Sequence, residues 1–398
     1  MSVASRAFAG TPAASHTLRI LLALGPAVGG MAHHVTALVR GLDRVRFEVA
    51  LAGPPEGPAA DAARAASCAM YPLRFRPSPV TAAMSAVRLA GLVRRETFTL
   101  VHAHGYSAAG AAALSRSLAS GHRLVCTLHN FLTGTSAQAI TGWRARWLLG
   151  LIARRADRII TVSDSLHAQF EGIADARGKL CTIPNGIDLT AFANMDRARA
   201  RRELGLPENA PVVGMVGRLA AQKGPLAFLR AAALVGRRFP DARFVLIGDG
   251  PLRGDVERLA AELAVTDRIV LAGHRADAPM LTQAFDVAVV ASLSEGSSLT
   301  AMEAMAWGVP VVGTAVGGVR EVVVDGETGV LVPPGDAQAL GHTITALLSD
   351  PQRARELGEA GRRRVEREFS VKTMVERTEQ IYLEAAHGTA QRGGGACG

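Results

Sequence analysis

The second half of the chain contains two carboxylates and two cations at positions where they could bind a phosphorylated ligand. Glu295 and Glu303, with seven residues between them, follow the apolar run at residues 287–290. Arg218 and Lys223 follow a similar run. A guanidinium and an ammonium at one strand end suit the two phosphates of a nucleoside diphosphate, and a carboxylate can accept both hydroxyls of a ribose. The alternative for both cations is ordinary surface charge.

The sequence around the two glutamates assigns them different places. A helix that begins near Ser298 leaves Glu295 in the preceding loop and puts Glu303 on the helix. Residues 304–307 beside Glu303 are apolar, so a solvated surface position fits this glutamate poorly. We therefore expect both carboxylates to face a ligand.

The first half offers a glycine turn and a histidine. Gly29 and Gly30 follow the first apolar run and open a helix, where backbone N–H groups could approach a diphosphate closely. A glycine turn after a strand is equally a packing device. His129 ends the run Thr127-Leu128-His129, and its alternative is a hydrogen-bonded histidine at a strand end.

Short apolar runs alternate with helical patterns along nearly the whole chain, which predicts an α/β fold with parallel sheets wrapped by helices. The pattern restarts after residue 211, so we predict two doubly wound Rossmann-like domains, with a candidate hinge at residues 187–211. The predicted boundaries are a flexible leader (1–16), the first domain (17–190), the second domain (191–370), a C-terminal helix that could cross back to the first domain (371–387) and a disordered tail (388–398). The predicted strands cover residues 18–24, 47–51, 100–102, 124–128, 158–162 and 180–183, then 212–216, 244–247, 269–271, 287–290, 309–312 and 330–332.

The composition limits which classes of protein this chain can belong to. Hydrophobic residues make up 48% and charged residues 20%, which is typical of a globular chain. No uncharged apolar stretch reaches the length of a spanning helix, and the first 17 residues lack a signal-like apolar core, so we expect a cytoplasmic protein. The four cysteines are widely spaced, which predicts neither a disulfide nor a zinc site. Adjacent His33 and His34 diverge on a helix and would not share an ion.

The net charge of +9 is uneven, because residues 1–195 hold 20 Lys and Arg against 10 Asp and Glu. Such a field would attract anionic lipid or a phosphorylated acceptor; no nucleic-acid motif accompanies it, and we expect no nucleic-acid partner. Residues 143–155 mix two tryptophans with four arginines and could lie on an anionic membrane surface. The alternative is a flanking helix that packs its aliphatic residues inward.

Taken together in order, these motifs resemble the retaining glycosyltransferases of family four, which have the GT-B architecture of two Rossmann-like domains facing across a cleft. The resemblance runs from about residue 18 to residue 369. Its markers are Gly29-Gly30, Val101-His102-Ala103-His104, Thr127-Leu128-His129, Ala156-Asp157-Arg158-Ile159-Ile160-Thr161-Val162-Ser163, Ile183-Pro184-Asn185-Gly186-Ile187-Asp188, and the pairs Arg218/Lys223 and Glu295/Glu303.

The resemblance implies a role for each matching position. Gly29 and Gly30 would hold the donor diphosphate from the first domain, Arg218 and Lys223 from the second, and His129 would sit near the sugar. Glu303 would bind the ribose and Glu295 the donor-sugar hydroxyls. Backbone groups of Gly296, Ser297, Ser298 and Leu299 would contact sugar and phosphate, and Gly273, His274 and Arg275 would lie near the base. Many relatives have a bulky apolar residue where Ser297 stands, which leaves the donor sugar open.

The resemblance also implies a reaction. The donor bond would break toward an oxocarbenium-like state while Arg218, Lys223 and the Gly30 amide stabilise the leaving diphosphate, with no metal or other cofactor required. We expect a UDP-sugar, with GDP-mannose as the alternative, and a glycan or lipid-linked acceptor in cell-surface polysaccharide or glycolipid synthesis. The glycine spacing argues against a nicotinamide dehydrogenase. A nucleotide-sugar epimerase or a non-catalytic nucleotide-sugar-binding protein of the same fold remain the alternatives.

Overall fold

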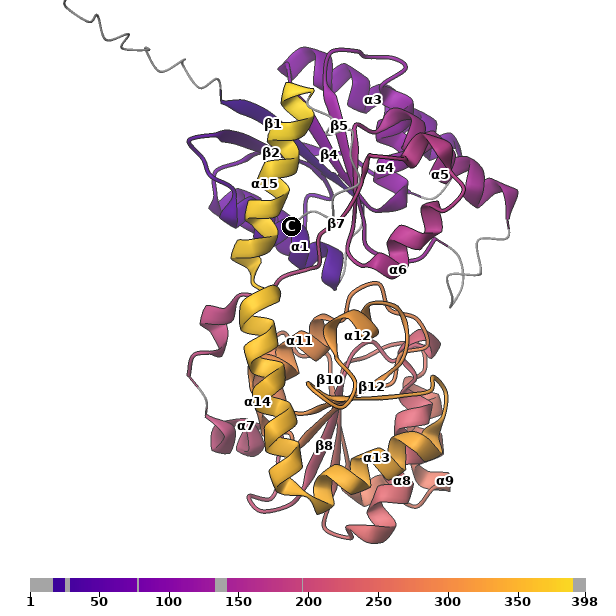
Figure 1. The fold of residues 1–398 in the computed structure, drawn as a ribbon, viewed down its shortest axis with the longest axis vertical. Coiled ribbons are helices and arrows are strands. Elements are labelled where there is room, and N and C mark those ends of the chain that lie inside the picture. The colour runs from indigo at the N-terminus through magenta and orange to yellow at the C-terminus, as the bar shows by residue number, and fades with distance from the viewer. Residues whose placement is uncertain (1–16, 26–28, 77–78, 133–141, 195, 389–398) are drawn as a thin grey trace, which may run out of the picture.

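Two parallel β-sheets, each covered by helices on both faces, make up the described chain. The structure is a computed structural model and describes residues 17–25, 29–76, 79–132, 142–194 and 196–388. The predicted leader at residues 1–16 and the tail from residue 389 onward lie outside the described residues. Figure 1 shows the two sheets stacked along the long axis of the molecule, joined by crossing segments on one side.

The first sheet has seven parallel strands in the order β3-β2-β1-β4-β5-β6-β7. Its strands are β1 (Leu18–Leu24), β2 (Phe47–Gly53), β3 (Ala69–Pro72), β4 (Leu100–His104), β5 (Arg123–Leu128), β6 (Arg158–Thr161) and β7 (Leu180–Thr182). Its helices are α1 (Gly30–Gly41), α2 (Pro58–Ala65), α3 (Pro79–Glu96), α4 (Gly105–Ser115), α5 (Trp143–Arg155) and α6 (Asp164–His167). The strand order reverses between β1 and β4, which is where ligands bind in such sheets.

The second sheet has six parallel strands in the order β10-β9-β8-β11-β12-β13 and reverses between β8 and β11. Its strands are β8 (Val212–Val216), β9 (Arg243–Ile247), β10 (Ile269–Gly273), β11 (Val287–Val290), β12 (Val311–Thr314) and β13 (Val330–Val332). Its helices are α7 (Arg197–Glu203), α8 (Pro225–Arg238), α9 (Arg253–Glu262), α10 (Ala278–Leu281), α11 (Leu299–Ala306), α12 (Gly317–Val322), α13 (Ala337–Ser349) and α14 (Pro351–Glu368). The predicted α/β fold with two doubly wound domains is confirmed.

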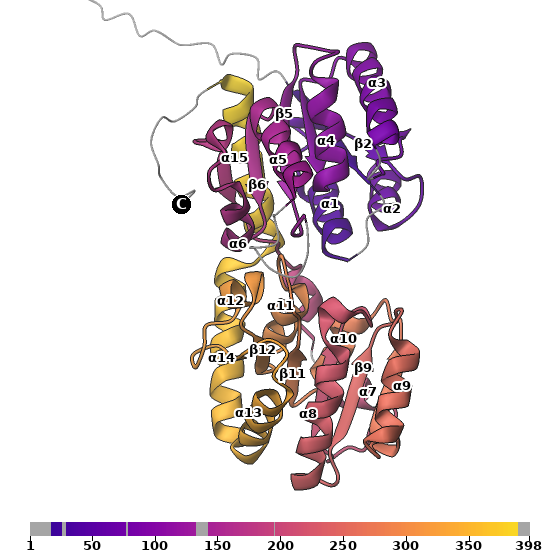
Figure 2. The same cartoon turned by 90° about the vertical axis from the view of Figure 1, so that its right-hand side faces the viewer.

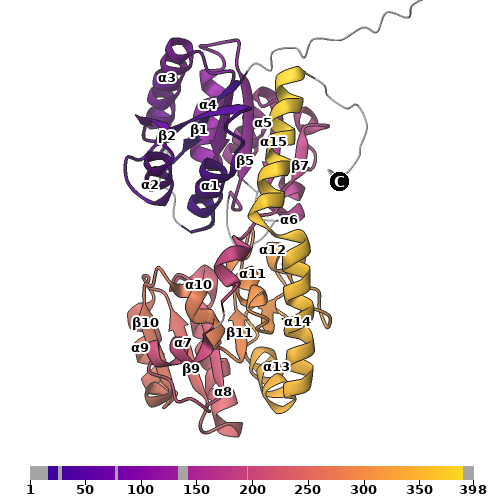
Figure 3. The same cartoon turned by 90° about the vertical axis from the view of Figure 1, so that its left-hand side faces the viewer.

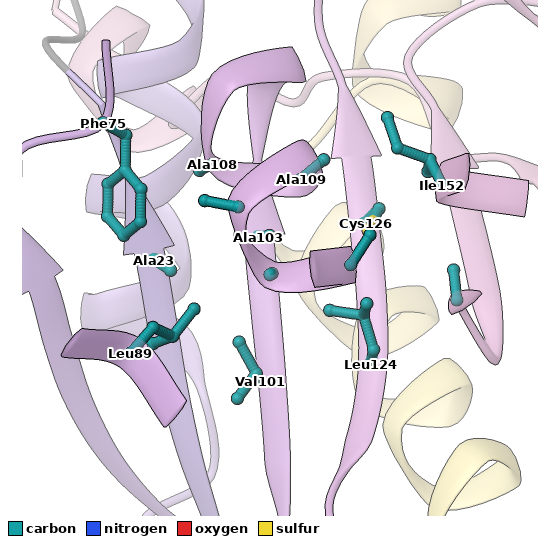
Figure 4. Close-up of a cluster of buried hydrophobic side chains, with 14 of the residues drawn as sticks. Ala23, Phe75, Leu89, Val101, Ala103, Ala108, Ala109, Leu124, Cys126 and Ile152 are labelled. Carbon is teal, nitrogen blue, oxygen red and sulfur yellow. The ribbon is translucent and has the colours of Figure 1, made fainter. Parts of the chain in front are cut away.

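Each face of each sheet carries its own apolar core. On one face of the first sheet, α4 presents a run of buried alanines to β4 and β5 (Figure 4). Because alanine is short, this helix packs close to Val101 and Leu124 of those strands. The strands are therefore buried on both sides, which explains their almost uninterrupted apolar sequences.

The chain crosses between the domains twice at one place. Ile187 forms an isolated parallel bridge with Ser370, and its N–H donates to the carbonyl oxygen of Phe369. Beyond this point the final helix, α15 (Val371–His387), runs back along the first domain (Figure 3). There the buried Tyr382 donates its hydroxyl to, or accepts from, the His102 imidazole at 2.6 Å. The first domain is thus completed by the end of the chain.

Two expectations need correction. Phe192, Leu204 and Leu206 pack into the core of the second domain, so this part of the candidate hinge at residues 187–211 belongs to that domain. Cys181 is disulfide-bonded, so the expectation of free thiols throughout is wrong at this residue, although Cys68 and Cys126 are free. No helix among the described residues has both the length and the apolar character to cross a membrane.

Candidate functional site

The loops that follow the switch-point strands carry most of the expected site residues. Gly29 and Gly30 follow β1, Arg218 and Lys223 follow β8, and Glu295 follows β11. Figure 2 shows α1 and α6 at the lower end of the first domain, opposite α10, α11 and α12 of the second. Residues far apart in the sequence are thereby directed toward one interdomain gap.

Two helix N-termini meet across this gap. An added Cβ at Gly30, the first residue of α1, would lie 3.6 Å from the Leu299 side chain, which begins α11. Gly29 caps α1 with φ of 62°, a left-handed conformation that favours glycine, and no side chain caps the helix. The Ser298 hydroxyl accepts from the Ala301 N–H of α11. Free backbone N–H groups and the positive ends of two helix dipoles form a setting for an anion.

Lys223 and Glu295 form an ion pair in this structure. The Lys223 Nζ lies 2.5 Å from Glu295 Oε2, and the Ser292 hydroxyl donates to the same oxygen at 2.9 Å. Both charged side chains are largely removed from solvent, so the pair is screened little by water. A ligand that needs Lys223 for its phosphates and Glu295 for its sugar hydroxyls must therefore replace this contact. Arg218, by contrast, is exposed and has no ion-pair partner among the described residues.

Glu303 is an isolated carboxyl group in α11. Burial raises its pKa from 4.5 to about 8. Its neighbours Met302, Ala304 and Met305 are buried, and within the described ranges no side chain donates a hydrogen bond to its carboxylate. Glu303 itself keeps partial exposure to solvent, but a largely desolvated carboxyl without a donor costs free energy, which two ligand hydroxyls could offset.

The backbone of Gly296 lies directly against the first domain. A Cβ added at Gly296 would lie 2.2 Å from the carbonyl oxygen of His129, closer than any side chain allows. On its other side, a Cβ at Gly318 would lie 2.4 Å from the Gly296 carbonyl oxygen, and the Gly318 N–H donates to the Glu295 carbonyl at 2.9 Å. The loop that carries Glu295 is therefore clamped between α12 and His129.

The loop after β10 only partly matches the expectation for a base-binding loop. Gly273 accepts from the Gly248 N–H at 2.7 Å, which joins the ends of β9 and β10. His274 is exposed, whereas the Arg275 guanidinium is held by Asp277 at 2.6 Å and Glu203 at 3.5 Å. In this structure Arg275 is paired with protein carboxylates, and its side chain stays 33% exposed.

Several residues of the site region escaped sequence reasoning. Asn185 lies 3.6 Å from the added Cβ of Gly30 and accepts from His34 Nδ1 at 2.9 Å. Glu321 of α12 reaches the first domain, where its carboxylate accepts from the N–H groups of Asp164 and Ser165 at 2.8 and 3.0 Å. Asn185 belongs to the motif at residues 183–188, but the sequence does not show that it contacts His34. Nothing in the sequence marks Glu321 as an interdomain contact.

A cavity of about 2280 Å³ among the described residues adjoins this region and does not coincide with it. Its walls include Ser297 and Gly318 but none of Gly30, Lys223 or Glu303. Ten arginines and Lys179 line it against six carboxylates, so its field is positive. A second, basic compartment thus opens beside the loop that carries Glu295.

Two doubly wound domains that meet at the carboxyl ends of their strands define the GT-B class. The family model "Glycosyltransferase Family 4" matches residues 28–191, and "Glycosyl transferases group 1" matches residues 196–364. The chain belongs to this family of glycosyltransferases, as the ordered motifs predicted.

Similar proteins agree with this assignment. The chain is 31% identical to a D-inositol 3-phosphate glycosyltransferase of Corynebacterium urealyticum, over 74% of each chain. It is 33% identical to a GDP-mannose-dependent alpha-(1-6)-phosphatidylinositol monomannoside mannosyltransferase of Mycolicibacterium smegmatis, over 61% of this chain and 65% of that relative, just under two thirds of its length. The structure of Anabaena HepE in complex with UDP superposes with a TM-score of 0.81 at 22% identity, covering 92% of this chain and all of that one.

Proposed function

We propose that this glycosyltransferase moves a sugar, with retention of configuration, from a nucleoside diphosphate sugar to an anionic acceptor. The observation that carries the proposal is the meeting of the α1 and α11 N-termini at Gly30 and Leu299, beside the Lys223–Glu295 pair. Two helix dipoles and two cations, Lys223 and Arg218, supply positive charge where a leaving diphosphate gains negative charge. Because those groups can stabilise that charge, we propose that no metal ion is required.

The proposed roles divide the donor among the described residues. Glu303 binds the ribose hydroxyls, Glu295 the sugar hydroxyls, and the loop at Gly273 and His274 the base. Among the residues that the structure describes, no second carboxylate pairs with Glu295 as a nucleophile and acid would, so we propose front-face transfer in which the leaving phosphate oxygen accepts the acceptor proton. The preferred base is uracil, with guanine as the alternative, since relatives and structural neighbours are named with both.

The basic cavity supports an anionic acceptor. Its walls include Ser297, two residues after Glu295, and first-domain residues such as Arg177 and Lys179. Arg177 and Arg320 in these walls are exposed, and neither forms an ion pair with another described residue. We propose that a phosphorylated or lipid-linked acceptor lies here with its phosphate toward these guanidinium groups.

Peripheral contact with an anionic membrane is part of the proposal. Trp143 and Trp147, one turn apart on α5, are 73% and 60% exposed, while Leu149 and Ile152 of the same helix are buried. The helix therefore packs its aliphatic residues inward and also presents two tryptophans outward. Exposed tryptophans beside Arg144 are suited to the interface of an anionic bilayer.

The donor test uses a thermal-shift and calorimetry panel of UDP, GDP and ADP, followed by hydrolysis of sugars carried on the base that binds. We expect UDP to stabilise the wild type, Glu303→Ala to abolish this stabilisation while the protein stays folded, and Glu327→Ala, at an exposed position, to leave it intact. Unchanged UDP binding in Glu303→Ala contradicts the ribose role. Binding without any hydrolysis or transfer would instead favour a non-catalytic nucleotide-sugar-binding protein.

The acceptor and membrane arms are tested separately. Arg320→Ala should raise KM for a phosphorylated acceptor at unchanged donor KM, and Arg230→Ala, an exposed arginine on α8 outside the cavity, is the matched control. For the membrane, a Trp143→Ser/Trp147→Ser variant should lose co-sedimentation with phosphatidylglycerol vesicles, whereas Leu118→Ser should retain it. If the wild-type protein does not sediment with these vesicles at low salt, membrane contact is refuted.

A further inference from the structure

Three histidines from separate elements converge inside the first domain. His34 lies in α1, His104 ends β4 and His129 follows β5. Their exposed fractions are 0%, 1% and 5%, and one ring nitrogen of each lies within 4.8 Å of one ring nitrogen of the others. We call these three residues the histidine cluster. A fourth histidine, His102, stacks beside His104, but Tyr382 and Thr127 satisfy both of its nitrogens.

The histidine cluster holds three ring nitrogens without a partner. They are His34 Nε2, His104 Nε2 and His129 Nδ1. A buried polar atom left unsatisfied costs about 1–3 kcal/mol, so such atoms are rare in folded proteins without a role. His34 Nε2 is therefore free to bind a ligand, and on the other two rings the nitrogens that approach each other are His104 Nδ1 and His129 Nε2, 3.3 Å apart.

The tautomer of His34 follows from its neighbour. Its Nδ1 lies 2.9 Å from Asn185 Oδ1, and an amide oxygen can only accept a hydrogen bond. His34 Nδ1 therefore carries the proton and Nε2 presents a lone pair. This is the arrangement of a metal-ligating histidine, whose second nitrogen donates to an oxygen that fixes the ring. Burial also lowers the pKa of all three imidazoles, to about 4 for His34, which keeps them neutral.

We propose that His34, His104 and His129 form a binding site for one transition-metal ion of the Zn²⁺ type. His104 Nδ1 and His129 Nε2 lie 3.3 Å apart, and a tetrahedral ion with bonds of about 2.0–2.1 Å separates two ligand nitrogens by about 3.4 Å. The third imidazole needs to approach by about 1.5 Å at most to complete the set. Imidazole ligands select zinc, cobalt, nickel or copper over magnesium and calcium, which prefer oxygen.

The ion would act as an inhibitor of transfer, a consequence that rests on the proposed function. The His129 carbonyl oxygen lies against Gly296, in the loop that carries Glu295, and the family resemblance assigns the His129 side chain a place near the donor sugar. A ligated His129 could not contact a donor sugar. Metal binding itself does not depend on transferase activity, so the two proposals fail independently.

The test titrates the metal-free full-length protein with Co²⁺, whose visible absorption becomes intense in tetrahedral coordination. We expect one Co²⁺ per chain, displaced by Zn²⁺. His34→Gln and His104→Gln should each weaken binding at least about tenfold, and Asn185→Ala should weaken it about 10–100-fold by releasing His34. His33→Gln is the matched control, because the neighbouring His33 bonds the Gly186 carbonyl outside the cluster and should leave binding unchanged.

Two outcomes overturn the site. One is the absence of a saturable tetrahedral Co²⁺ spectrum in the wild type. The other is equal Co²⁺ affinity in the wild type, His34→Gln and His104→Gln, with circular dichroism showing that all are folded. If those variants do not fold, zinc-edge X-ray absorption of the wild-type complex decides the matter: three imidazole ligands are expected, and fewer than three contradict the assignment.

Discussion

The raised pKa of Glu303 predicts how the stability of the second domain depends on pH. A carboxyl whose pKa is 4.5 when unfolded and about 8 when folded binds its proton more tightly in the folded state. The folded state is then favoured most below pH 4.5, and stability declines as the pH rises from 4.5 to 8. Between pH 5 and pH 8 this one group removes about 3 kcal/mol.

Replacing the carboxyl isolates this effect. Glu303→Gln keeps the shape and cannot ionise, so we expect the variant to be as stable as the wild type at pH 5 to within about 1 kcal/mol and more stable by about 3–4 kcal/mol at pH 8. For a domain of this size that corresponds to a Tm difference of roughly 6–16 °C. Urea unfolding followed by tryptophan fluorescence at both pH values measures the gap. Parallel pH profiles of wild type and Glu303→Gln would refute the reasoning, and Glu327→Gln should follow the wild type.

Three further predictions concern the contacts between and within the domains. Gly296→Ala places a methyl group against the His129 carbonyl oxygen and should displace the loop by about 1 Å, which misplaces the reacting groups. The transfer rate should therefore fall about 10²-fold, while the circular dichroism of the protein stays unchanged. An unaffected rate would contradict the close approach. Lys223→Met leaves the Glu295 carboxylate without its ion-pair partner and should destabilise the second domain by up to about 3 kcal/mol. The double variant Lys223→Met/Glu295→Gln should recover this stability without recovering activity. Denaturant unfolding and transfer assays measure the two effects. Glu321→Gln weakens the three hydrogen bonds that this carboxylate accepts at the start of α6, from two backbone N–H groups and the Ser165 hydroxyl. Hydrogen exchange there should speed up by about tenfold, whereas Glu359→Gln on α14 should not change it.

The strands of both sheets could be predicted because burial on two faces leaves a simple signal. Residues 18–24, 212–216, 287–290 and 330–332 are strands with the predicted bounds. The strand β3 (Ala69–Pro72) was missed because it lies at the sheet edge, is only partly buried and ends in proline, so its sequence lacks the apolar run of a central strand. The pattern thus reports apolar burial: the edge strands β7, β10 and β13 keep a short apolar run and were predicted, whereas β3 lacks one.

Side chains of the site follow a different rule. Strand ends give the position of Lys223 and Glu295 separately, but their contact at 2.5 Å depends on how two loops fold over neighbouring strands. Similarly, alternation along β4 puts His102 and His104 on one face, yet the approach of His34 requires the packing of α1 on that face, and that of His129 requires β5 to pair with β4. His33 and His34 are adjacent in the sequence and point in different directions on α1, so they do not form a pair. His34 instead meets histidines from other elements.

The contacts between the domains imply that ligand entry and closure are linked. In the structure Gly296 touches His129, the α1 and α11 N-termini are in contact, and the Glu321 carboxylate caps α6 across the gap. If the donor diphosphate lies between those helix ends as proposed, the domains would separate to let it enter. The crossing at Ile187 and Ser370 is the only place in the described ranges where the chain itself passes between the domains, and rotation there would open the gap while α15 stays anchored to the first domain. With the proposed roles, closing around a donor would exchange the Lys223–Glu295 contact for contacts with phosphate and sugar, which would couple donor binding to the position of the loop that carries Glu295.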